Sequence, residues 1–77
     1  MTANTHLMAV FCAGTVTFDY VNYRNERSTR RAVFQALYYG TTPYHKEPQW
    51  FMKALDLDKN EIRDFALADM SGVIYEP

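Results

Sequence analysis

The amino-acid sequence predicts a single, mainly β domain that spans residues 1–77. Three observations support this prediction. The chain has 77 residues, which is enough for one domain. Hydrophobic residues make up 48% of it and aromatic residues 16%, so even a chain this short can form the dense core that a small domain needs. Runs rich in threonine, valine and aromatic residues alternate with polar turns, as expected for strands joined by hairpins.

The N-terminal residues do not follow this strand pattern. Residues 1–4 are expected to be disordered, and a short helix is expected from Thr5 to Gly14, which would end it. The only cysteine, Cys12, excludes an internal disulfide and lies in an apolar run, where we expect a buried and unreactive thiol. The helical spacing of apolar residues in this segment is carried by Leu7, Val10 and Phe11.

The next segment predicts a β-hairpin. Residues 15–23 alternate as a strand does, and Asn25 favours a tight turn over residues 24–26. Residues 27–39 then form the second strand. A helix over residues 29–39 is a competing interpretation because Arg, Ala, Gln and Leu favour helices, but the hairpin signal favours the strand. One face of the first strand would carry Val16, Phe18 and Tyr20.

A long loop and a third strand are expected after the hairpin. Residues 40–48 hold two prolines and a glycine, which leaves few backbone donors for a strand ladder. Residues 49–56 form an apolar run around the only tryptophan. We expect Trp50, Phe51 and Met52 to belong to the core. Because neighbouring residues of a strand point to opposite faces, at most one of Trp50 and Phe51 should point inward.

The C-terminal part predicts two short strands separated by a helical turn. A polar turn over residues 58–61 leads into a strand over residues 62–67. The same run also fits a helix capped by Asn60, and the sequence leaves this alternative open. One helical turn is expected at residues 68–71, followed by a strand over residues 73–75.

Several of these runs carry short motifs of a known family. The first strand reads Val16-Thr17-Phe18-Asp19-Tyr20, arginines lead the second, the third contains Trp50-Phe51-Met52, and the last motif runs from Arg63 to Met70. Over residues 7–75 these motifs resemble the WYL domain, whose Trp-Tyr-Leu triplet matches Trp50-Phe51-Met52. The resemblance implies a small β-barrel of the Src-homology-3 or Sm kind, with about five strands and a short N-terminal helix.

The resemblance also implies a role. WYL domains usually follow a DNA-binding winged helix in bacterial transcription regulators, and they are thought to sense ligands, including nucleotides or single-stranded nucleic acid, through basic residues. Matched by position, the arginine that opens the second strand is Arg30 or Arg31, and the tyrosine of the triplet is Phe51. Arg63 matches the arginine before the last phenylalanine. We expect a freestanding WYL-like protein of bacterial or phage origin, cytoplasmic and without an attached DNA-binding domain.

Arginines are concentrated in the predicted hairpin. Four of them, at positions 24, 27, 30 and 31, are interrupted by a single acidic residue, Glu26. Arginine suits phosphate because its planar fork can donate two hydrogen bonds at once, and nearby aromatic rings can stack bases. The alternative is a solvated hairpin with surface ion pairs worth about 0–1 kcal/mol each. The candidate ligand-binding residues are Arg30, Arg31, Phe51 and Arg63.

The sequence also narrows the classes of function. The net charge of -1 does not favour nucleic acid in bulk, so such a role needs a local basic patch. Residues 56–67 begin like a calcium loop, but Glu61 stands at the glycine position and Leu67 at the glutamate position, so we expect no calcium.

No nucleophile and base share a suitable spacing, so we expect neither catalysis nor a cofactor. No run approaches the roughly 20 apolar residues of a membrane span. The possible metal ligands are too scattered for a site: His6, Cys12 and His45.

We therefore expect a non-catalytic regulatory module, active in transcription regulation, that uses a basic face of the barrel to bind a ligand or nucleic acid. Its partner would be a nucleotide or a single strand of nucleic acid. The alternative is a protein-interaction or assembly module that forms a homodimer or a complex with another protein. Aromatic residues expected at the surface favour this alternative, namely Tyr38, Tyr39, Tyr44 and Tyr75.

Overall fold

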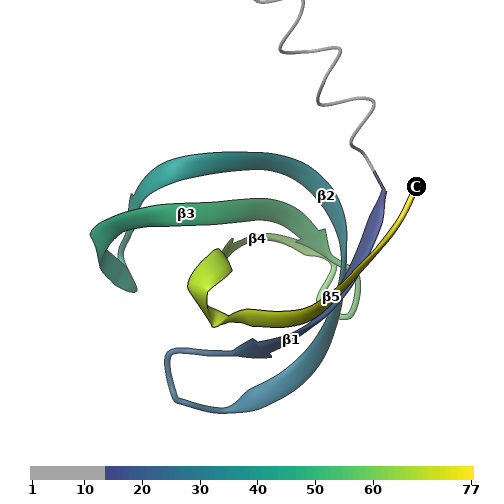
Figure 1. The fold of residues 1–77 in the computed structure, drawn as a ribbon, viewed down its shortest axis with the longest axis horizontal. Coiled ribbons are helices and arrows are strands. Elements are labelled where there is room, and N and C mark those ends of the chain that lie inside the picture. The colour runs from purple at the N-terminus through teal and green to yellow at the C-terminus, as the bar shows by residue number, and fades with distance from the viewer. Residues whose placement is uncertain (1–13) are drawn as a thin grey trace, which may run out of the picture.

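The computed structural model describes residues 14–77, which form a single antiparallel sheet of five strands. The prediction of a mainly β protein with about five strands is confirmed, whereas the predicted helix from Thr5 and the thiol of Cys12 lie outside the described residues. The strand order across the sheet is β4-β3-β2-β1-β5 (Figure 1). The elements are β1 (Thr15–Val21), β2 (Arg27–Thr42), β3 (His45–Asp56), β4 (Glu61–Ala66), the 3-10 helix η1 (Leu67–Asp69) and β5 (Met70–Glu76).

The sheet is open, so the predicted closed barrel is wrong. Within the described residues β4 pairs only with β3, and β5 pairs only with β1, which makes these two strands the opposite edges. The sheet is nevertheless strongly curved, and β2 and β3 bend together around η1 (Figure 1). The sheet stays open because the chain leaves β4 after Ala66 through η1, and then pairs with β1 instead of running beside β4.

The first hairpin forms as predicted, with β1 and β2 joined by a short polar turn. Asn25 adopts a φ of 63°, in the left-handed region that asparagine tolerates better than most residues. The side chain of Asn22 closes the turn, because its Oδ1 accepts the backbone N–H groups of Arg24 and Glu26, both at 2.9 Å. The turn residues therefore set the register of the two strands.

The second strand forms instead of the competing helix, and a bulge divides it. The register with β3 shifts by one residue between Phe34 and Ala36. Because side chains alternate along a strand, the extra residue Gln35 places Leu37 and Tyr39 on the face that carries Phe34. The two halves of β2 therefore bury different sets of side chains.

The loop predicted over residues 40–48 is wrong, because β2 and β3 extend through it and leave a two-residue turn. Thr42 Oγ1 accepts the backbone N–H groups of Tyr44 and His45 at 3.2 and 3.1 Å, which stabilises this turn. Pro48 is tolerated in β3 because β4 starts to pair further along, and because the register with β2 shifts at this point.

The C-terminal elements confirm the strand interpretation of residues 61–66, and the alternative helix capped by Asn60 is wrong. Asn60 instead adopts a φ of 54° in the turn between β3 and β4. The predicted helical turn is present as η1, one residue earlier than expected, and β5 is longer than the predicted strand over residues 73–75. The described residues contain no helix with the length and apolar character needed to cross a membrane.

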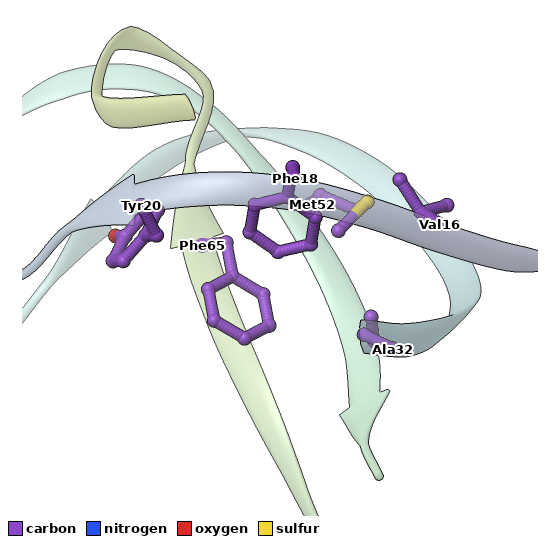
Figure 2. Packing of buried hydrophobic residues seen from close by; sticks show 7 residues of the cluster. Val16, Phe18, Tyr20, Ala32, Met52 and Phe65 are labelled. Carbon is purple, nitrogen blue, oxygen red and sulfur yellow. The ribbon is translucent and has the colours of Figure 1, made fainter. Parts of the chain in front are cut away.

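The core lies on one face of the curved sheet and draws on four strands (Figure 2). The rings of Phe18, Tyr20 and Phe65 meet edge to face, with centroids 5.0–6.1 Å apart. This arrangement adds favourable quadrupole contacts to the burial of apolar area. The other members of the cluster are Val16, Ala32, Met52 and Ala54.

Trp50 is the clearest departure from the predicted core. Its side chain is 53% exposed, whereas Phe51 and Met52 are buried as predicted. The prediction that at most one of Trp50 and Phe51 points inward is confirmed. Trp50 stays outside because β4 ends at Ala66, opposite Phe51, and provides no further neighbour along that edge of β3.

Candidate binding pocket

An open pocket of about 390 Å³ lies where two turns of the sheet meet strand β4. One part of its wall comes from the end of β1 and the turn after it, and a second part comes from the β2–β3 turn. The third part comes from β4, and Arg30 reaches the pocket from β2. Its lining residues are Tyr20, Asn22, Tyr23, Arg30, Thr42, Pro43, Tyr44, His45, Ile62, Arg63, Asp64 and Phe65.

Arg30 is held in place by the interior of the protein. Its side chain is only 13% exposed, and Nη1 lies 3.2 Å from Oδ2 of Asp56. Nε donates to Ser28 Oγ at 2.8 Å. The guanidinium carbon lies 5.8 Å from the ring centroid of Tyr20 and 6.0 Å from that of Phe65, within cation–π range. Two of the five guanidinium N–H groups are used in these hydrogen bonds, which leaves others for a ligand.

Asp56, the partner of Arg30, is completely buried at the end of β3. Its other oxygen, Oδ1, accepts the backbone N–H groups of Asp58 and Lys59 at 3.0 and 3.3 Å. The same carboxylate therefore fixes both the β3–β4 turn and the arginine of the pocket. Asp56 was not among the functional residues expected from the sequence. The available signal was an aspartate at a strand end just before a polar turn, where its side chain can accept turn N–H groups.

Arg63 reaches the same pocket from the edge strand β4. It lies opposite Ala54 in the β3–β4 register, on the face that carries the core. Its side chain is 41% exposed, and Nη1 lies 3.2 Å from Oε1 of Glu61. An ion pair this exposed is weak, so a ligand anion can compete for the guanidinium.

The other two candidate residues lie outside the pocket. Arg31 is exposed and follows Arg30 directly in β2, so its side chain is on the opposite face of the strand. Phe51 is 0% exposed and stacks on Tyr38 with centroids 5.3 Å apart. Phe51 is therefore part of the interior and does not line the pocket. Of the four candidates, the structure brings together Arg30 and Arg63.

Two tyrosines form the exposed rim of the pocket. The rings of Tyr23 and Tyr44 are stacked, with centroids 5.1 Å apart and an interplanar angle of 27°. They connect the β1–β2 turn to the β2–β3 turn. His45 holds the second turn against η1, because its Nε2 lies 3.2 Å from Oδ2 of Asp69. These two contacts bring the β2–β3 turn to the pocket.

Tyr20 lines the pocket and carries a neutral, buried hydroxyl. Burial raises the pKa of this phenol, and its oxygen accepts the backbone N–H of Ala66 at 3.0 Å. The hydroxyl therefore stays protonated at neutral pH, and it can still donate its own hydrogen.

The charges around the pocket are balanced. Arg30 pairs with Asp56 and Arg63 with Glu61, while Asp64 is paired with Lys53 at 3.2 Å. The arginines therefore act as directed hydrogen-bond donors more than as a source of positive field. Residues 14–77 contain no group of three or more histidine, cysteine or acidic residues that could hold a metal ion.

These observations define a small protein with an open, curved β-sheet and a pocket lined by two arginines and aromatic rings. Comparison of the chain with protein-family models and with curated proteins found no match. The resemblance to the WYL domain thus rests on the motif residues alone.

Proposed function

We propose that this chain is a non-catalytic, WYL-like regulatory module whose pocket binds an anionic ligand with a planar ring, namely a nucleotide or the end of a single strand of nucleic acid. The observation that carries the proposal is the convergence of Arg30 and Arg63 beside the rings of Tyr20, Tyr23 and Tyr44. Phosphate needs directed cationic donors, and a base needs an aromatic surface; the pocket offers both.

The pocket residues would contact different parts of the ligand. Arg63, which is half exposed and only weakly paired, meets the phosphate. Tyr23 and Tyr44 present their exposed rings to the base. Arg30 keeps its geometry through Asp56 and contributes its remaining N–H groups. Occupancy would stabilise the β2–β3 turn against the body of the protein, and this change would be the regulatory signal.

A titration with matched variants tests the proposal. Nucleoside monophosphates and a short oligothymidylate are added to the protein, and binding is followed by calorimetry and by amide chemical shifts. We expect Arg63→Gln to weaken binding at least about tenfold, because a hydrogen bond to a charged group contributes about 1.5–3 kcal/mol. Arg31→Gln, an exposed arginine on the opposite face, should leave the affinity unchanged.

Two results contradict the proposal. If the wild-type protein binds neither probe, the pocket has a different ligand class. If Arg31→Gln weakens binding as much as Arg63→Gln does, the anion is held outside this pocket.

A further inference from the structure

Half of the β2–β3 hairpin extends beyond the parts of it that pair with β1 and β4. β1 pairs with β2 only over residues 27–33, and β4 pairs with β3 only over residues 51–56. Residues 35–42 and 45–50 therefore pair only with each other among the described residues. We call this two-stranded segment the outer ribbon. A two-stranded ribbon is marginally stable in water unless one of its faces is covered.

One face of the outer ribbon is exposed and apolar. Tyr39 lies opposite Trp50, and the register places Leu37 on the same face. The exposed fractions of Leu37, Tyr39 and Trp50 are 54%, 60% and 53%. The rings of Tyr39 and Trp50 touch edge to face, with centroids 5.5 Å apart. None of the three lines the pocket. We call these three side chains the ribbon patch.

We propose that the ribbon patch is the interface of a symmetric dimer, and that its partner is a second copy of this chain. The only charged side chains in the outer ribbon are Lys46 and Glu47, apart from His45 if it is protonated, so two copies can meet without net repulsion. In a two-fold arrangement the lysine of one copy can face the glutamate of the other. A strongly charged partner such as nucleic acid would find no net complementary charge in the outer ribbon, because Lys46 lies next to Glu47.

The area of the patch fits a reversible dimer. Side chains of this size that are about half exposed offer on the order of 100 Å² each, so two patches would bury on the order of 600 Å². The flanking ribbon residues add to this area and bring it towards the lower end of specific interfaces, where complexes are weak. Tyrosine and tryptophan are the residues most enriched at the centres of such interfaces.

Sedimentation equilibrium from micromolar to submillimolar concentration tests the dimer. We expect the average mass of the wild-type protein to rise towards twice the monomer mass. Tyr39→Lys and Tyr39→Glu should each remain monomeric because like charges then meet across the two-fold axis. A mixture of the two variants should form a heterodimer again, which loss of fold would not produce.

Ile74→Lys serves as the matched control, because Ile74 is also apolar and 61% exposed but lies on β5. This variant should dimerise as the wild type does. The proposal is overturned if the wild type stays monomeric or if Tyr39→Lys still dimerises. It is also overturned if the mixture of Tyr39→Lys and Tyr39→Glu stays monomeric, or if Ile74→Lys abolishes the dimer. Circular dichroism confirms that each variant is folded.

Discussion

At the scale of single residues, Asp56 connects the pocket to the fold. It is completely buried, and it neutralises Arg30 while accepting two turn N–H groups. We expect Asp56→Ala to destabilise the protein by about 3–5 kcal/mol, because it leaves a largely buried guanidinium without its acidic partner. A domain of this size has a total stability of only about 4–12 kcal/mol, so much of it would be lost. Urea unfolding measures the change.

Two further variants separate the roles of this carboxylate. Asp56→Asn keeps an oxygen for the turn but removes the charge, so it should cost less than Asp56→Ala. Asp58→Ala, an exposed residue of the same turn, should change stability by less than about 0.5 kcal/mol. Equal effects of Asp56→Ala and Asp58→Ala would show that the Arg30–Asp56 ion pair contributes nothing to the stability of the protein.

We expect the ionisation of Tyr38 to lower the stability of the protein at alkaline pH. Burial and the nearby carboxylate of Asp64, which also accepts a hydrogen bond from the phenol, raise the pKa of Tyr38 from 10.0 to about 12. Folding therefore favours the neutral phenol. The resulting stability is fully present below pH 10 and is lost as the pH rises from 10 towards 12. Tyr38→Phe has no phenol to ionise, so its stability should fall less steeply over this range.

The matched measurement is urea unfolding at neutral pH and above pH 10, with phenolate absorbance followed in parallel. Asp64→Asn should lower the pKa of Tyr38 towards its ordinary value because it removes the negative charge. Tyr39→Phe, an exposed neighbour, should leave the alkaline transition unchanged. If Tyr38→Phe and the wild type lose stability equally, Tyr38 does not control this transition.

At the scale of elements, local patterns predicted the type of most strands but not their ends. The alternation in β1, β2 and β3 is strong enough to identify them. The bulge at Gln35 has no comparable signature, because any residue in an extended run can be the unpaired one. Pro48 and Gly40 suggested a loop, yet both lie in strands. Whether a strand accepts a proline depends on its neighbours in the sheet, which the local sequence does not show.

At the scale of the whole molecule, the missed features depend on contacts between distant residues. The resemblance implied a closed barrel, but closure requires β4 and β5 to meet, and no local signal reports this. Arg30 and Arg63 were identified from their residue type and motif positions, and the structure places both at one pocket. The pairing of Arg30 with Asp56 could not be predicted, because 26 residues separate them. The exposure of Trp50 follows from the short length of β4.

The charge of the whole molecule predicts how ligand binding depends on salt. The net charge is -1, and each arginine of the pocket already has an acidic neighbour, so no extended positive field attracts an anion. A single strand should therefore displace few counterions. With contacts to one or two phosphates, the slope of log K against log salt should be about -0.7 to -1.4.

Titrations of the oligothymidylate at several salt concentrations measure this slope, and Arg63→Gln should make it shallower by about 0.7. Arg31→Gln, at an exposed arginine on the opposite face of β2, is the control and should leave the slope unchanged. A slope several times steeper would mean that the strand runs along the exposed arginines of the hairpin instead of ending in the pocket. In that case the balanced charges of the pocket would be irrelevant to binding, and the aromatic rim would have to be explained without a nucleotide.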